Sequence, residues 1–473
     1  MNNLVSVGLL VFLLALIFLS IKYVKYAGVR DFLIASNSTV PPIILGIGYF
    51  ATQYSMSMFM SQPGVISDAG YAGMSISLPG AAFTFIIPIL LVGLKIISIN
   101  KDRKFVTMSD YFSNRFDNKL LSYLLSLSII IFVIPAAAVQ LIGLGVILNT
   151  YTGLPTMLCS IGIGILVIAY CMIGGIRSVL WGDLAQGILM LFTSVAIFVT
   201  SIAAQGGLET INQTLLNLNK EFLTYPGADE KYTWSVYFSM ILMWSLFSIG
   251  QPHLFTKFYL VNDVKALSKA AMYGTVGVVI SAICVEWAGV NLIPYGLENG
   301  IDKESLIVSF AINNTGILIS SILLTGIASA GLSTVSSQII AVSSCIIKDF
   351  LKLETQKKGV LLSKTIIGIV GIAAICIAAI RPALMFNIVL FAFGGLGLWG
   401  ILLILSLYCK NLNSNAVTLS IIVAELSYFL QLTFNFNTYG FNPVIISSLI
   451  LLVTLGISNT IWNNYGKLLC RKC

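Results

Sequence analysis

The amino-acid sequence predicts an all-α integral membrane protein with about 13 transmembrane helices. Two observations lead to this fold class. Of the 473 residues, 58% are hydrophobic and only 9% are charged, whereas soluble domains carry about 25% charged residues. The hydrophobic residues also gather in runs of about 20, the length that an α-helix needs to cross a bilayer. The composition therefore excludes an ordinary soluble enzyme and a disordered chain.

Polar, glycine or proline breaks divide the chain into candidate spans. The first apolar run has no basic residue before it and is followed by Lys22, Lys25 and Arg30. A signal peptide has the reverse polarity, so we expect this span to be retained. The longest polar stretch, about 204–233, is too short for a soluble domain. We predict a single transmembrane domain over 1–473, with spans at about 4–21, 40–65, 71–97, 121–148, 155–174, 180–203, 234–258, 269–294, 317–347, 362–380, 384–408, 415–432 and 443–463.

The basic residues predict how the chain is oriented in a cell membrane. With the N-terminus outside and the C-terminus cytoplasmic, 22 of the 26 Lys and Arg residues fall on the cytoplasmic side. Cytoplasmic loops of membrane proteins carry such an excess of positive charge. The formal net charge of +8 is then a sign of orientation rather than of nucleic-acid binding. The basic residues left outside are Lys220, Lys231, Lys303 and Arg381.

Two of the predicted spans contain helix-breaking sequences. Span 40–65 has a polar stretch after Phe50 and then Pro63-Gly64, and span 234–258 contains Pro252 within residues 248–253. Inside a membrane, such breaks survive where the freed carbonyls line a cavity. The two spans lie five spans apart, as the first helices of two inverted five-helix repeats would. We predict repeats at about 40–203 and 234–408, with the first span and the last two peripheral; two simple packing kinks are the alternative.

Span 317–347 carries one polar stripe. Ala330, Ser333, Thr334 and Ser337 follow the i, i+3, i+4, i+7 spacing of a single helix face. Small residues of this kind also form close-packing seams between membrane helices. Two adjacent hydroxyls facing a broken helix nevertheless suit a hard monovalent cation such as Na⁺, which prefers several oxygen ligands.

Several motifs resemble the sodium:solute symporter family over nearly the whole chain. They are Gly174-Gly175-Ile176 followed by Asp183-Leu184-Ala185-Gln186-Gly187, Ser333-Thr334, Ser343-Ser344 and Lys348-Asp349. The resemblance implies a thirteen-span protein with an inverted-repeat, leucine-transporter-like core. It also implies sodium-coupled import of a small organic solute by alternating access.

The solute is suggested by finer similarities within the family. The region from Ala51 to Gly64 is most similar to members that carry pantothenate, which implies pantothenate or a similar monocarboxylate. Trp244 and Gly250-Gln251-Pro252-His253 instead resemble members that carry proline, so an amino acid is the alternative.

The resemblance also implies an ion site between the break in span 40–65 and the polar stripe. Its sodium ligands would be the carbonyls of Ala51, Tyr54 and Ala330 and the hydroxyls of Ser333 and Thr334. Asp183 would serve sodium coupling or the inner gate. The alternative for Asp183 is a solvated carboxylate at the start of a helix, favoured there by the helix dipole.

The solute is expected near the membrane midplane, beside both breaks. The candidate substrate ligands are Ser55, Ser57, Gln140, Trp244 and Gln251.

Two further carboxylates, Glu286 and Glu425, lie inside predicted spans, where acidic side chains need a partner or a proton. We expect Glu425 to be structural and leave Glu286 open.

Other function classes fit the sequence poorly. A membrane enzyme would need paired carboxylates, a Ser/His arrangement or a metal cluster, and the chain has one histidine. No segment resembles the filter of a channel, and no soluble output module suggests a sensor. The expected ligands are the solute and Na⁺ as coupling ion, with no cofactor and no nucleic acid. The bilayer is the expected surrounding, and the oligomeric state is left open.

Overall fold

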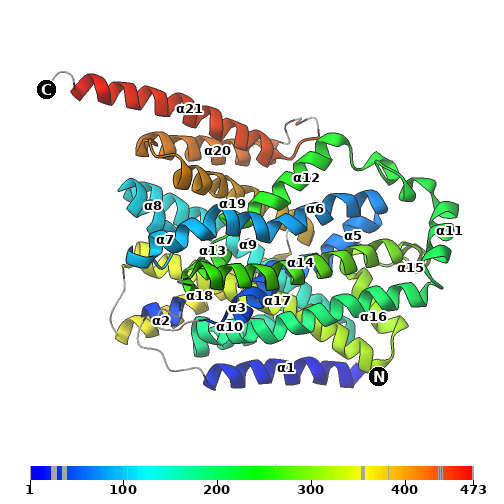
Figure 1. Ribbon diagram of the computed structural model, residues 1–473. Coiled ribbons are helices and arrows are strands. Elements are labelled where there is room, and N and C mark those ends of the chain that lie inside the picture. Colours follow the sequence, from blue (N-terminus) through cyan, green and yellow to red (C-terminus); the bar gives the residue numbers. More distant parts are fainter. Residues whose placement is uncertain are drawn as a thin grey trace.

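The computed structural model describes residues 2–470, except 23–28, 35–39, 104, 262, 353–356, 382, 435, 437 and 439. Figure 1 shows the described chain as a bundle of helices, with no strand among these residues. Helix α1 (Asn2–Lys22) runs along one side of the bundle, and α20 (Ser414–Phe434) and α21 (Pro443–Cys470) run along the opposite side. The predicted all-α membrane fold is therefore confirmed.

The helices follow the predicted spans closely. Within the described residues, nine helices are long and apolar enough to cross a membrane, and they account for every predicted span except 4–21, 40–65 and 234–258. The uninterrupted helices are α9 (Lys119–Thr152), α14 (Val264–Asn291), α17 (Ile317–Cys345), α18 (Lys357–Ile380), α19 (Met385–Tyr408), α20 and α21.

The third span is irregular near its end. Helix α6 (Tyr71–Pro88) passes through a π-helical turn at Ile89–Gly93 into α7 (Leu94–Arg103). Shorter helices lie between the spans: α2 (Val29–Ile34), α8 (Met108–Phe116), α11 (Leu208–Leu218), α15 (Ile293–Asn299) and α16 (Leu306–Asn314).

Two predicted spans are joined in one long element, α10 (Thr156–Ala204). Its 49 residues would make a straight helix of about 73 Å, more than twice the hydrocarbon thickness. Gly175 interrupts it with φ 56° and ψ −156°, values that residues with a Cβ rarely adopt. A Cβ on Gly175 would also lie 2.6 Å from the Phe32 carbonyl oxygen. The break therefore separates the spans predicted at 155–174 and 180–203.

The spans predicted at 40–65 and 234–258 are both broken, but the first is interrupted at Tyr54–Ser55, whereas Pro63-Gly64 lies inside a helix. The first consists of α3 (Pro42–Gln53), α4 (Met56–Phe59) and α5 (Ser61–Ser67). The second consists of α12 (Trp234–Phe247), the 3₁₀ turn Ser248–Gly250 and α13 (Pro252–Phe255). Helix α3 packs against α10, α14 and α17, and α13 also contacts α3 and α17. The centre of the bundle, where α3, α13 and α17 lie in Figure 1, therefore brings both breaks against the helix with the polar stripe.

Candidate functional site

The break after α3 leaves backbone carbonyls without their usual helical donors. Tyr54 adopts φ −85° and ψ 76° and Ser55 is extended, so the helical ladder stops before α4. The amide of Ser55, which would bond to the carbonyl of Ala51 in a continuous helix, bonds instead to that of Gln53. The carbonyls of Ala51 and Thr52 therefore need other donors in this buried place.

Side chains of α17 supply those donors. Ser333 Oγ donates to the Ala51 carbonyl at 2.6 Å, and Thr334 Oγ1 donates to the Thr52 carbonyl at 2.9 Å. Both hydroxyls also lie near the carbonyl of Ala330, at 3.2 and 2.9 Å. The structure thus gathers four of the five predicted sodium ligands in a buried cluster of oxygens. The fifth, Tyr54, lies at the break itself, with its hydroxyl turned to the Ser281 carbonyl of α14.

A buried ion pair lies beside this cluster. Lys257, in the turn after α13, is within 2.8 Å of Asp183 on α10. Lys257 Nζ also donates to Thr52 Oγ1 at 2.7 Å and to the Gly48 carbonyl at 2.9 Å, so its three protons have three acceptors. Asp183 has no exposed surface, which rules out the solvated carboxylate considered for it. The other oxygen of Asp183, Oδ1, has no hydrogen-bond partner among the described residues.

Thr52 and Lys257 are the functional residues that sequence reasoning missed. Thr52 connects the two groups of side chains, because its carbonyl accepts from Thr334 while its hydroxyl accepts from Lys257. Lys257 is one of the 22 basic residues predicted on the cytoplasmic side, but only 3% of its side chain is exposed. The available signal was position: Lys257 falls inside the span predicted at 234–258, where an ammonium group requires a buried acceptor.

Three of the predicted substrate ligands lie together at the start of α4. Ser55 Oγ and Ser57 Oγ share a hydrogen bond of 2.8 Å. Gln140 on α9 accepts from the Met56 amide at 3.0 Å, and its side-chain nitrogen donates to the Ala136 carbonyl at 3.3 Å. All three predicted residues are buried. The break therefore presents a second polar group, made of hydroxyls and an amide, on the side of α4 and α9.

The other two predicted substrate ligands have different surroundings. Trp244 lies in an aromatic cluster, with ring centroids 5.3 Å from Phe247 and 5.7 Å from Phe393. Gln251 is extended at the second break, and its buried side-chain nitrogen has no partner among the described residues. No described hydrogen bond connects either residue to Ser55, Ser57 or Gln140.

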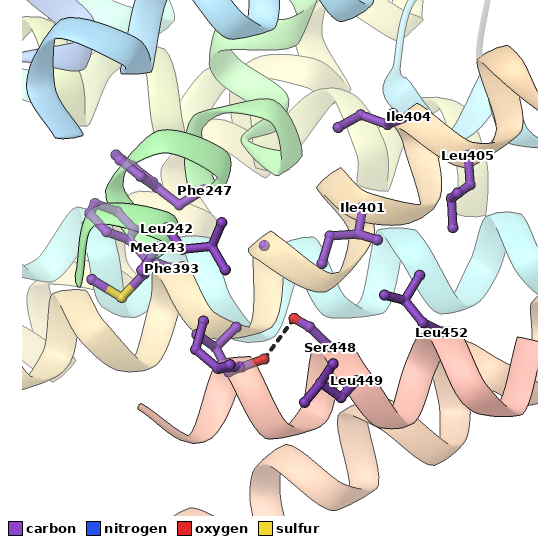
Figure 2. Close-up of a pocket in the computed structure, with 13 residues that line it drawn as sticks. Leu242, Met243, Phe247, Phe393, Ile401, Ile404, Leu405, Ser448, Leu449 and Leu452 are labelled. Carbon is purple, nitrogen blue, oxygen red and sulfur yellow. Dashed lines mark hydrogen bonds between the residues drawn. The ribbon is translucent and has the colours of Figure 1, made fainter. Parts of the chain in front are cut away.

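An apolar cavity adjoins the aromatic cluster. It has a volume of about 300 Å³ and lies between α12, α19 and α21. Figure 2 shows that its labelled lining is aliphatic and aromatic except for the thioether of Met243 and the hydroxyl of Ser448, which donates its proton to the Val444 carbonyl. The cavity therefore offers no free polar group to orient a charged solute, and it is separate from the oxygen cluster at the first break.

The two intramembrane glutamates differ in their partners. Glu425 Oε1 accepts hydrogen bonds from Ser128 at 2.7 Å and from Trp399 Nε1 at 2.9 Å. Glu286 is fully buried, and neither of its oxygens has a hydrogen-bond partner among the described residues. Glu425 thus connects α20 to α9 and α19 through hydrogen bonds. No described hydrogen bond accounts for the position of the Glu286 carboxyl.

Comparisons with known proteins agree with the membrane fold and with sodium as the coupling ion. Residues 32–423 match the model of the sodium:solute symporter family. The chain is 27% identical to the sodium/pantothenate symporter of Escherichia coli, over 88% of this chain and 87% of that protein. It is 26% identical to a sodium/proline symporter of Staphylococcus aureus, over 85% and 80% of the two chains. The structure of a Na⁺-coupled sialic acid symporter superposes with a TM-score of 0.81 at 22% identity, covering 97% of this chain and 98% of that one.

Proposed function

Because the chain belongs to the sodium:solute symporter family, we propose that the solute it imports with sodium is pantothenate or a similar monocarboxylate. The chain is a multi-pass membrane transporter and not an enzyme, and Na⁺ is its coupling ion. The observation that carries the site assignment is the meeting of the α17 hydroxyls with the carbonyls freed at the first break.

The proposed sodium site consists of the carbonyls of Ala51, Tyr54 and Ala330 with the hydroxyls of Ser333 and Thr334. Four of these residues already share hydrogen bonds of 2.6 to 3.2 Å. A sodium ion between them would take the role that the hydroxyl protons now have, drawing the same oxygens around one positive charge. None of the five side chains is charged, so the occupied and empty sites differ by a full unit of charge.

We assign Asp183 and Lys257 to the coupling gate next to that site. Lys257 holds the side chain of Thr52, whose carbonyl is bonded to the sodium-site residue Thr334. A shift of α3 on sodium binding would therefore change the contacts of the ion pair directly. Removing one partner of a buried pair leaves an uncompensated charge and costs about 3–5 kcal/mol. The pair thus favours one arrangement of α3, α10 and α13 strongly.

The proposed solute position is the polar group of Ser55, Ser57 and Gln140. Gln251 and Trp244 stay candidate ligands from the sequence, although no described hydrogen bond or ring contact joins them to that group. Hydroxyl and amide groups suit the hydroxyl, amide and carboxylate of a molecule such as pantothenate. The similarity to a sodium/pantothenate symporter supports this solute. The similarity to a sodium/proline symporter supports proline as the second candidate.

The orientation remains our proposal, with the N-terminus outside, the C-terminus cytoplasmic and the inner gate on the cytoplasmic side. The uneven distribution of Lys and Arg supports it. Burial of Lys257 removes one residue from the cytoplasmic surface and leaves the asymmetry intact. The division into repeats at about 40–203 and 234–408 likewise stays a prediction.

Uptake into proteoliposomes tests the solute and the ion together. Purified protein is given labelled pantothenate or labelled proline, with an inward gradient of Na⁺ or of K⁺. We expect pantothenate to accumulate only with the Na⁺ gradient. Accumulation of proline and not pantothenate would identify proline as the solute instead. Uptake driven equally by K⁺ would overturn the sodium site.

A further inference from the structure

The apolar cavity between α12, α19 and α21 is elongated along α19. Figure 2 shows Phe247 and Phe393 toward one end and Ile404, Leu405 and Leu452 toward the other. Along α19 the lining extends from Phe393 to Leu405, about 18 Å at 1.5 Å per residue. This length is roughly half of the 30 Å hydrocarbon core of a bilayer. The cavity therefore has the depth of one lipid leaflet.

The break in the second span accounts for the cavity. The residues of α12 that line it end at Phe247, and the rest of the lining comes from α19 and α21. After Phe247 the chain turns into the bundle, where a Cβ on Gly250 would lie 1.8 Å from the Leu396 carbonyl oxygen and α13 contacts α3 and α17. A continuous α12 would instead run on beside α19 and α21. The cavity thus lies where the missing part of that helix would pack.

The cavity is open toward the membrane and has an apolar lining. Leu242, Leu449 and Leu452 are 45%, 58% and 43% exposed, and they belong to helices of the membrane-spanning part. The hydroxyl among the lining groups, that of Ser448, already donates to the Val444 carbonyl. Apolar protein cavities of about 150 Å³ stay dry and take up apolar molecules. A cavity of about 300 Å³ that faces lipid therefore suits a hydrocarbon chain.

A positive charge lies beyond one end of the cavity. Tyr408 follows the lining residues Gly397, Ile401 and Ile404 on the same face of α19, since the four positions have the i, i+4, i+7, i+11 spacing. Lys95 Nζ of α7 lies 4.4 Å from the centre of the Tyr408 ring. None of the ion pairs among the described residues includes Lys95. The helix face that lines the cavity therefore leads to an unpaired cation about one turn further on.

The position of this cation matches the polar surface of one leaflet. Tyrosine and lysine at the end of a membrane helix are typical of the boundary between lipid and water. In the proposed orientation, α19 ends on the cytoplasmic side, and the cytoplasmic leaflet carries anionic lipids. Basic groups between membrane helices on that side bind lipid headgroups. A phospholipid with its phosphate at Lys95 would have an acyl chain directed along the cavity.

We propose that the cavity binds one acyl chain of an anionic phospholipid whose phosphate contacts Lys95. The chain packs against the stacked rings of Phe247 and Phe393, whose centroids are 4.0 Å apart. Because Phe247 directly precedes the second break, the bound lipid stabilises the contact of α12 with α19 at that break. This site goes beyond the proposed import of a solute, and its occupancy does not depend on which solute is carried.

Native mass spectrometry of the purified full-length protein tests the headgroup. The protein is given phosphatidylglycerol or phosphatidylcholine with identical acyl chains, and we expect one phosphatidylglycerol to be retained more strongly. Lys95→Gln should weaken its binding about fivefold, the equivalent of about 1 kcal/mol for one lysine near an anionic lipid. Lys269→Gln, which removes an exposed lysine of α14, is the control. Equal retention of the two lipids by wild type, or equal losses in the two variants, would overturn the proposal.

Variants that fill the cavity test the acyl-chain site. Gly397→Leu should extend into it, because Val444 alone lies within 4 Å of a Cβ at that position, at 3.8 Å. Ile401→Phe fills the middle of the cavity and decides the test if Gly397→Leu does not fold. Phosphatidylglycerol should raise the unfolding temperature of wild type and of the control Gly162→Leu, whose Cβ meets open space, but not of the filled variants. The same increase in the filled variants would overturn the site.

A photoreactive group at the end of the acyl chain locates the chain without any substitution. The full-length protein is placed in phosphatidylcholine vesicles that contain the labelled phosphatidylglycerol. We expect adducts on Met243, Phe247 and Phe393, at the end of the cavity remote from Lys95. Excess unlabelled phosphatidylglycerol should remove these adducts, and excess phosphatidylcholine should not. Adducts spread evenly over the exposed faces of α1, α10 and α21 would show surrounding bilayer lipid only and would overturn the proposal.

Discussion

Both broken spans interrupt a helix inside the bundle, but the backbone groups freed at the two breaks find different partners. At the first break, the carbonyls after α3 are met by hydroxyls from a distant helix, through Ser333 and Thr334. At the second break, the backbone largely satisfies itself: the amides of Leu254 and Phe255 both donate to the Gln251 carbonyl, at 3.2 and 3.0 Å. The first break thus gathers oxygens from two helices, which is the arrangement on which the proposed sodium site rests.

The second break is instead a close-packed joint. A Cβ on Gly250 would lie 1.8 Å from the Leu396 carbonyl oxygen of α19, so the two backbones touch. The Ser248 hydroxyl donates to the Thr84 carbonyl of α6 at 2.8 Å. Proline and glycine in a membrane helix therefore predict an interruption, but the neighbouring helix decides whether the interruption becomes a polar site or a packed contact.

The largest expected effect tests the packed joint. Gly250→Val should prevent the folded bundle from forming, because its Cβ would overlap the α19 backbone and backbone cannot move as a side-chain end can. Yield of monodisperse protein and its thermal unfolding measure the effect. Gly162→Ala is the control, since nothing lies within 4 Å of a Cβ at that position. A stable Gly250→Val protein would show that the joint is not tight.

Disrupting the ion pair beside the first break should have the next largest effect. Lys257→Met leaves Asp183 buried without its cation and should lower the free energy of unfolding by about 3–5 kcal/mol. Thermal unfolding in detergent measures the change, and adding Asp183→Asn to Lys257→Met should restore most of it. Lys231→Met, in a partly exposed pair with Asp68, should cost less than about 1 kcal/mol. Equal losses in the two single variants would contradict the special role of the buried pair.

The sodium site predicts a smaller and more selective change. Ser333→Ala and Thr334→Ala each remove an oxygen ligand, and we expect the Na⁺ concentration for half-maximal uptake to rise about tenfold, the equivalent of about 1.4 kcal/mol. The solute concentration for half-maximal uptake should change far less. Uptake at varied Na⁺ and fixed solute measures this difference, and an unchanged sodium dependence would rule out the assignment.

Ser248→Ala should give the smallest effect and completes the comparison. It removes a hydroxyl of the second break that bonds to Thr84, and should cost about 1 kcal/mol of stability. Because this hydroxyl lies in the packed joint, the sodium dependence of uptake should match wild type. A rise in the required Na⁺ like that of Ser333→Ala would mean that both breaks serve the ion.

Features that depend on local chemistry could be predicted from the amino-acid sequence. The spans follow from apolar runs, and the breaks within residues 50–59 and 248–253 follow from their polar residues, glycine and proline. The interruption at Gly175 falls at the predicted boundary between the spans 155–174 and 180–203. The helical stripe of Ala330, Ser333 and Thr334 was also predictable, because 3.6 residues per turn place these positions on one face. Each of these inferences needs only residues that are neighbours along the chain.

Which of these features contact one another depends on how the helices pack. Lys257 and Asp183 are 74 positions apart, and no local pattern indicates that they form an ion pair. The same holds for Thr52, which gains its role from α17 and Lys257 together, and for Trp244, which joins an aromatic cluster instead of the serines at α4. The physical reason is that periodicity specifies which face a side chain takes on its own helix, whereas the packing of several helices specifies what that face touches.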